Sequence, residues 1–199
     1  AGGDSGAAAD ASKDSAGPAI RIDRVAIEQG AISYRDAKSG ETIQVDGFDA
    51  TLSAESLKGP FAGVGEFNFR KVPINFAIST GTLAGLGAVS VSAEFGVGRA
   101  DVKLTFRGQA SEPTAEAHVT GKLQFSGGNF GGLLTVLTQL AGQSGADLPK
   151  IAQAYSFAAA VDATSRDIAL NDLELELGNS NASGAISAAL GVRMRLDVA

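Results

Sequence analysis

The sequence predicts a mainly β protein, in which a long antiparallel sheet curls to form a groove and a short amphipathic helical pair packs on it. Two observations predict this fold. Segments such as residues 102–107 and 74–79 alternate apolar and polar side chains, which gives a sheet one apolar and one polar face. Only the stretch from about residue 130 to 155 changes to helical spacing.

Composition is that of an ordinary folded chain and excludes several functions. Of the 199 residues, 44% are hydrophobic and 19% are charged. The net charge is -6, with 16 Lys and Arg dispersed among 22 acidic residues, so nucleic-acid binding is not expected. The chain has no Cys, which excludes disulfides and thiolate metal sites. No stretch approaches the roughly 18 apolar residues of a membrane-spanning helix.

The two ends of the chain differ in composition from its middle. Residues 1–17 are rich in Ala, Gly, Ser and Asp, and we predict a flexible low-complexity linker there. Residues 18–199 are predicted to form the β domain. Residues 192–199 have the pattern of a strand with no turn sequence after it. We therefore expect a fragment of a longer protein, with any membrane anchor outside this chain.

Strands are predicted in order from Pro18 onward, separated by Gly- and Pro-containing turns. Residues 20–34 change phase near Gly30, which indicates two short strands. A hairpin turn is expected at 36–40, a strand at 42–45, a turn at Asp46-Gly47 and another at 71–73. The remaining predicted strands cover residues 48–57, 64–70, 74–80, 89–95, 101–107, 115–125, 157–164, 168–177 and 183–199.

The helical stretch has an apolar stripe and a capping residue. Asn129 is suited to the N-cap. A second helical turn or two is expected at 148–155, with Pro149 near its start. The polar positions are uncharged, so packing on the sheet is favoured over binding to a membrane surface, which attracts Lys and Arg. The stripe consists of Phe130, Leu133, Leu134, Leu137, Leu140 and Ala141.

Residues that could support catalysis are few, and each favours a simpler interpretation. His118 falls on the polar phase of its strand, and no second His completes a metal site. Glu174 and Glu176 share one face of a strand, whereas catalytic carboxylates face each other across a substrate. The glycines at 127–132 precede a helix but lack the spacing of phosphate-binding loops. The prediction is a non-enzyme with no catalytic residue, no metal and no cofactor.

Several segments together carry a resemblance to a known family. They are residues 27–36, then Leu57 to Phe61 with Gly-Pro-Phe at its end, the leucine-rich helix with Leu148-Pro149, and residues 168–178 followed by Gly184. In order and spacing, over about residues 20–199, they resemble the AsmA family of bacterial envelope proteins. The resemblance implies a periplasmic location in a Gram-negative bacterium, tethered to the inner membrane through an upstream anchor. It also implies a role in phospholipid transport and outer-membrane biogenesis, similar to eukaryotic bridge-like lipid transfer proteins.

The predicted helices are too short to cover the apolar face of so long a sheet. Apolar surface left in water costs about 25 cal/mol per Å². Either the sheet folds over itself, or lipid acyl chains cover the face. We therefore expect a segment that holds or conducts phospholipid acyl chains; the alternative is a non-catalytic structural or assembly module that binds other envelope proteins. The predicted lining, for which a dry core is the other interpretation, is Phe67, Phe69, Phe76, Ile78, Val102, Leu104, Phe106, Leu123 and Phe125.

Overall fold

The computed structural model describes residues 20–35, 40, 42–83, 87–98, 101–111, 117–143, 148, 150–189 and 195–198. This part of the chain forms eleven strands and one helix. They are β1 (Ile22–Arg35), β2 (Thr42–Ala54), β3 (Phe61–Phe69), β4 (Val72–Thr80), β5 (Val89–Val97), β6 (Val102–Ala110), β7 (Val119–Gly127), α1 (Phe130–Leu140), β8 (Tyr155–Ala163), β9 (Asp167–Leu177), β10 (Ser180–Ala189) and β11 (Arg195–Val198).

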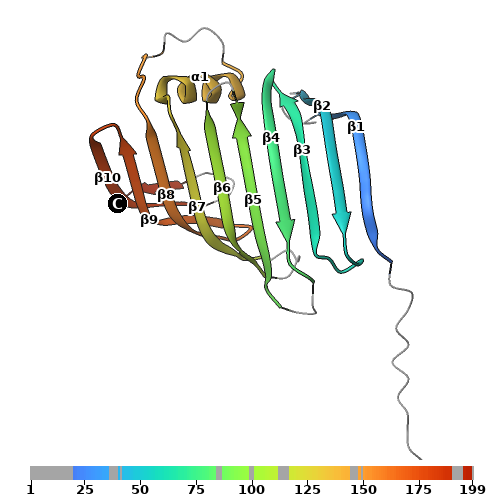
Figure 1. Ribbon diagram of the computed structural model, residues 1–199. Helices are drawn as coiled ribbons and strands as arrows, with labels where there is room; N and C mark the ends of the chain where they lie inside the picture. Colours follow the sequence, from blue (N-terminus) through green and yellow to red (C-terminus); the bar gives the residue numbers. More distant parts are fainter. Residues whose placement is uncertain are drawn as a thin grey trace, which may run out of the picture.

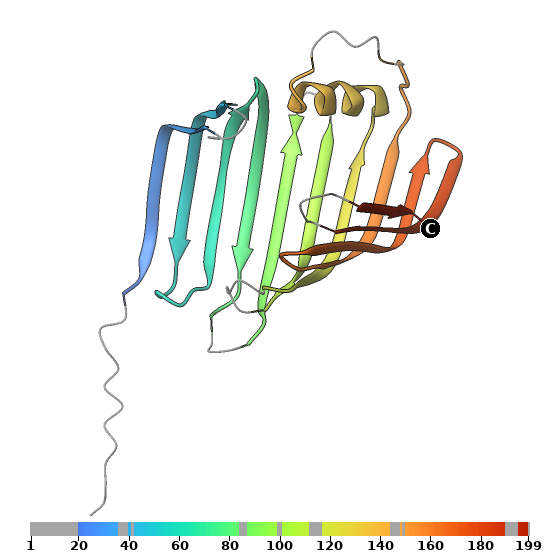
Figure 2. The same cartoon turned by 180° about the vertical axis from the view of Figure 1, so that it is seen from behind.

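All eleven strands belong to one sheet, in which every strand pairs antiparallel with the next one in sequence (Figure 1). The order β1 to β11 leaves β1 and β11 as its two edges. Seen from behind, α1 lies across the upper ends of the middle strands (Figure 2). The predicted fold class, a long antiparallel sheet with little helix, is confirmed.

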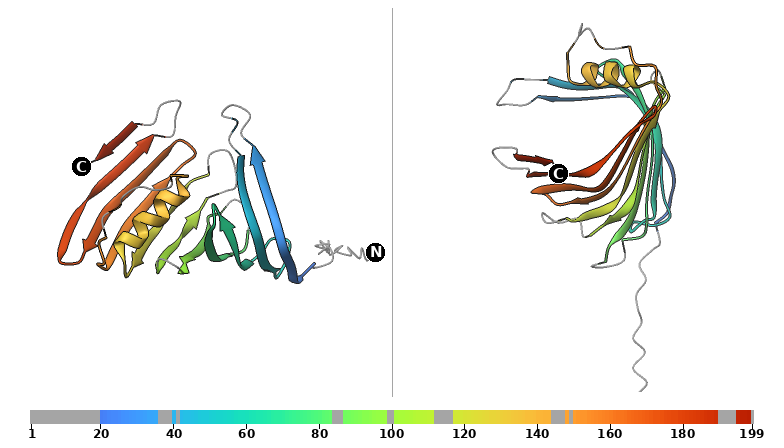
Figure 3. Two further views of the ribbon diagram at one scale, coloured as in Figure 1. Left: turned by 90° about the horizontal axis from the view of Figure 1, so that it is seen from above. Right: turned by 90° about the vertical axis from the view of Figure 1, so that its left-hand side faces the viewer.

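The sheet is curled, and α1 lies on its concave side (Figure 3). Cross-strand pairs such as Phe95 with Leu104, and Leu104 with Phe125, place large apolar side chains on the same face. We call this the apolar face. Val102, Val97 and Tyr155 on this face pack against Leu133 of α1, so the apolar face is the concave one. The face that the alternation makes apolar is therefore the one on the inside of the curl.

The first two strands are longer and less regular than predicted. Residues 22–35 form one strand, not two, because β-bulges absorb the phase changes: the register with β2 shifts on both sides of Gly30, and Gln29 has a φ of 52°. Likewise, β2 continues through the predicted Asp46-Gly47 turn. Gly47 has a φ of 57°, and the register with β3 shifts between Asp46 and Asp49.

Two further boundaries differ from the prediction. The β3–β4 turn consists of Arg70 and Lys71, both with positive φ, while Val72 and Pro73 pair within β4. Residues 183–199 do not form one strand, because β10 ends at Ala189 and β11 pairs back on it, with Ile186 opposite Val198. Most of the expected hairpin turn at 36–40 lies outside the described residues, as does the predicted linker at 1–17.

Only the first of the two predicted helical segments forms. Asn129 is the N-cap of α1, as predicted, and its side chain accepts a hydrogen bond from the Gly132 N–H at 3.0 Å. Residues 150–154 are not helical. Instead, the carbonyls of Gln153 and Ile151 accept the N–H groups of Phe130 and Gly131. The start of α1 is therefore hydrogen-bonded to the non-helical segment that stands in place of the predicted second helix.

Candidate functional site

All nine residues predicted to line the groove lie on the apolar face. Their pairing shows it: Phe67 opposes Ile74, Phe106 opposes Leu123, and Ile78 opposes Ala93. In each case, the intervening residues on the same strands point to the other face. The period-two pattern was enough to place these side chains because β3, β4, β6 and β7 pair without a register shift among themselves or with β5.

Two of the nine lie beneath α1 or beside the cluster that it covers. Val102 belongs to a buried cluster, and Phe125 packs against it. Phe125 and Phe130 also contact the Tyr155 ring, with centroids 5.4 and 5.7 Å away. For Val102 and Phe125, the dry-core interpretation therefore describes the structure better. The cluster consists of Val72, Val97, Val102, Leu133, Val136 and Tyr155.

An aromatic cluster lies on the apolar face of β2, β3 and β4. The rings of Phe48, Phe67 and Phe76 have centroids 5.9 to 6.4 Å apart, on β2, β3 and β4. Phe67 and Phe76 were predicted to line the groove, but Phe48 was not. The bulge at Gly47 explains the omission, since it places Phe48 on the apolar face out of step with the preceding residues.

Strands β1 and β2 contribute exposed apolar side chains that the prediction also missed. Ile32 is 57% exposed and Tyr34 is 60% exposed, and their partners on β2 are Val45 and Ile43. The repeated bulges in β1 concealed them, because no single period-two phase runs through that strand. The large apolar side chains left exposed on this face of β1 to β4 are Val25, Ile32, Tyr34, Ile43, Leu52 and Ile78.

Two facing glycines make room for the Phe106 ring on the apolar face. Gly108 and Gly121 oppose each other on β6 and β7. A Cβ on Gly121 would lie 2.8 Å from Cε2 of Phe106, and one on Gly108 would lie 2.7 Å from Cζ of the same ring. The Phe106 ring therefore lies over the two glycines, and any larger residue there would displace it.

Both ends of α1 are tied to neighbouring segments. At its N-terminus, the Phe130 and Gly131 N–H groups bond to carbonyls at 3.0 and 2.9 Å, and Gly132 bonds to the Asn129 side chain. These donors are the groups that a helix terminus would offer to a phosphate, so the glycine-rich segment is a helix start. Near the C-terminus, Gln139 Nε2 donates to the carbonyl oxygen of Arg70 at 3.0 Å.

Tyr155 brings one polar atom into the cluster under α1. Its hydroxyl is buried and has no hydrogen-bond partner. Burial, and next the negative charge of Asp101, raise the pKa of Tyr155 above its ordinary value of 10.0. The hydroxyl is therefore a neutral group at physiological pH, enclosed by protein, and is not positioned to take part in chemistry.

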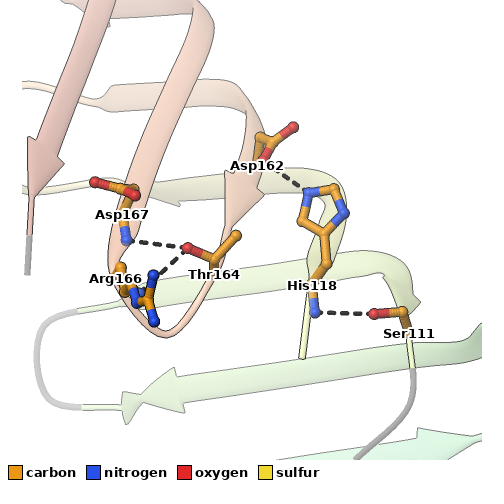
Figure 4. Close-up of polar contacts among 6 residues, drawn as sticks. All are labelled: Ser111, His118, Asp162, Thr164, Arg166 and Asp167. Carbon is orange, nitrogen blue, oxygen red and sulfur yellow. Dashed lines mark hydrogen bonds and ion pairs between the residues drawn. The ribbon is translucent and has the colours of Figure 1, made fainter. Parts of the chain in front are cut away.

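The polar face shows ordinary surface contacts at the positions considered for catalysis. His118 Nε2 lies 2.8 Å from Asp162 Oδ1, and its backbone N–H donates to Ser111 Oγ (Figure 4). The contact with Asp162 joins the start of β7 to the end of β8, and the contact with Ser111 joins it to the end of β6. Ser156 Oγ donates to Glu176 on the neighbouring strand. Among the described residues, no three His, Cys, Asp or Glu side chains gather to hold a metal ion.

A hollow of about 460 Å³ also lies on the polar face, over β5 to β9. Lys103 and Arg107 stand on one side of it, each near Glu94 at 3.7 and 3.8 Å, and Glu174 and Glu176 stand on the other. Its floor carries small residues such as Ser126 and Ala158. These ion pairs are well exposed and contribute little stability.

Comparisons with protein-family models, with curated proteins and with solved structures found no match to this chain. The AsmA resemblance therefore rests on the sequence segments themselves. Among the helices in the described part of the chain, none has the length and apolar character to cross a membrane.

Proposed function

We propose that the apolar concave face holds the acyl chains of lipids. The observation that carries this proposal is the row of large side chains left exposed there, led by Ile32 and Tyr34, on strands that α1 does not cover. Each CH₂ group of a lipid chain that covers such a surface gains about 0.8 kcal/mol. Binding of this kind needs apolar area and no catalytic group, which fits the scarcity of reactive side chains on this face.

The biological setting of this proposal comes from the AsmA resemblance. We propose a periplasmic segment of an inner-membrane-anchored protein that holds or conducts phospholipid in outer-membrane biogenesis. A curled, open sheet with one apolar face supports this setting, since a lipid can reach such a face from the side. A structural or assembly module is the competing function, and it needs no lipid on the apolar face.

Mass spectrometry of the purified chain after organic extraction tests the proposal. A lipid-holding segment is expected to retain phospholipid in a defined ratio to protein, whereas a spacer retains none. The matched variants are Ile78→Asp and Ser79→Asp, neighbours on β4 that point to opposite faces and are both exposed. Ile78→Asp should abolish most of the bound lipid because it places a charge in the apolar surface, and Ser79→Asp should not. Equal lipid content in both variants would refute the proposal.

A further inference from the structure

Helix α1 has two flanks beside its sheet-facing stripe. Leu133 and Val136 are buried against the sheet. At 3.6 residues per turn, Leu137 and Gln139 lie about 160° apart around the helix axis, one on each side of that stripe. Because α1 lies along one end of the sheet, one flank faces the strand ends and the other faces the middle of the strands (Figure 1).

The contact made by Gln139 decides which flank is which. Its side chain reaches the carbonyl oxygen of Arg70 in the turn between β3 and β4, at the same end of the sheet as α1. The flank with Gln139 therefore faces the strand ends. Leu137 lies on the opposite flank, directed back over the apolar face, and is 48% exposed. A leucine left half exposed beside an apolar surface still has room for a hydrocarbon neighbour.

The two threonines of α1 offer nothing similar. Thr135 Oγ1 donates to the Gly131 carbonyl, and Thr138 Oγ1 bonds to carbonyls of the preceding turn. Their hydroxyl donors are thus used within the helix. The helix carries no charged side chain. Leu137 is the only large apolar side chain of α1 that the structure leaves exposed. The predicted stripe was therefore wrong at two positions, because it included Leu137 and omitted Val136, which is buried.

We infer that α1 forms a wall of the lipid-binding surface, and that Leu137 contacts one lipid hydrocarbon chain lying alongside the helix. The inference rests on the proposed function and names the site within it. The dimensions agree: the 11 residues of α1 span about 16 Å. A bilayer core of about 30 Å gives each acyl chain about 15 Å. The hydrogen bonds at both ends of α1 hold this wall in place.

The test measures binding of cis-parinaric acid, a linear fatty acid whose fluorescence rises in apolar surroundings. Leu137→Asp should weaken its Kd about tenfold, equivalent to about 1.4 kcal/mol. The matched control is Thr135→Asp, an exposed position on the other side of the same helix, which should change Kd by less than about twofold. Leu137→Met keeps the size and apolar character and should bind like the natural chain.

The possible results separate a failure of the proposed function from a failure of the inference about Leu137. If the natural chain does not bind the fatty acid or retain phospholipid, the proposed function fails. If it binds and the two aspartate variants weaken binding equally, Leu137 is not a contact and the inference fails. Should Leu137→Asp not fold, a photoreactive benzoylphenylalanine at position 137 or 135 gives the answer. An adduct with the fatty acid is expected from 137, and an adduct from 135 alone overturns the inference.

Discussion

The two halves of the sheet are built by the same alternation but differ in what covers them. In β4 to β9, the upper end of the apolar face packs against α1, where Leu133 and Tyr155 are each only 4% exposed. In β1 to β3, the corresponding surface carries exposed Ile32, Tyr34 and Leu52. The segment between β7 and β8 folds back as α1, whereas residues 55–60, which connect β2 to β3, form only bends and turns. Burial on this sheet is therefore decided by one insertion, not by strand composition.

The largest effect is expected from removing a side chain in the covered half. Leu133→Ala should lower the free energy of unfolding by about 2 to 5 kcal/mol, because it leaves a cavity under α1. Ile32→Ala, in the uncovered half, should change it by less than about 1 kcal/mol, since the side chain is already largely in water. Urea unfolding of both variants measures the difference. Similar losses would show that the two halves are equally packed.

A smaller effect is expected from the glycine pair that seats Phe106. In Gly121→Ala, the new Cβ would lie 2.6 Å from the Arg107 carbonyl oxygen and 2.8 Å from the Phe106 ring. Overpacking of this kind costs about 1 to 3 kcal/mol. Gly98→Ala is the control, because its Cβ would meet nothing within 4 Å. Equal melting temperatures for Gly121→Ala and Gly98→Ala would contradict the placement of the Phe106 ring over the glycines.

Removing the N-cap of α1 should destabilise the helix and so expose the part of the apolar face that it covers. Asn129→Ala removes the side chain that accepts the Gly132 N–H, at a cost of about 1 kcal/mol. Hydrogen exchange should speed up first at α1, while β2 to β4 keep their protection. Uniform loss of protection across the sheet would show instead that α1 and the strands unfold as one unit.

The smallest effect concerns the buried hydroxyl of Tyr155. Because burial raises its pKa in the folded protein, the protonated form is favoured by folding. The resulting stability is complete below the unfolded value of 10.0 and is lost as the pH rises through the higher folded pKa. Absorbance titration of a Tyr34→Phe variant, in which Tyr155 is the only tyrosine, measures this pKa. A midpoint at or below 10.0 would contradict the buried position.

Tyr155→Phe gives the companion measurement at neutral pH. The hydroxyl has no hydrogen-bond partner, so its removal should leave stability unchanged or raise it by up to about 1 kcal/mol. A marked loss of stability would mean that the hydroxyl has a bonding partner in solution.

Regular strands were predictable, and bulged ones were not. The hairpin of β3 and β4 and the apolar phase of β6 and β7 follow from local alternation, because their pairing has no register shift. Along β1, each bulge reverses the apparent phase, so Ile32 and Tyr34 could not be assigned to the apolar face. The predicted site was accordingly centred on β3 to β7 and omitted β1, β2 and α1.

The sequence by itself determined the fold class, the apolar phase of the regular strands, the start of α1 and its Asn129 cap. These depend on residues within a few positions of one another. The tertiary structure alone decided that Ile151 and Gln153 give their carbonyls to α1, that Gln139 reaches Arg70, and which part of the apolar face α1 covers. Those contacts join residues as far as 69 positions apart. Their partners are fixed by strand register and sheet curl, which local propensity does not encode.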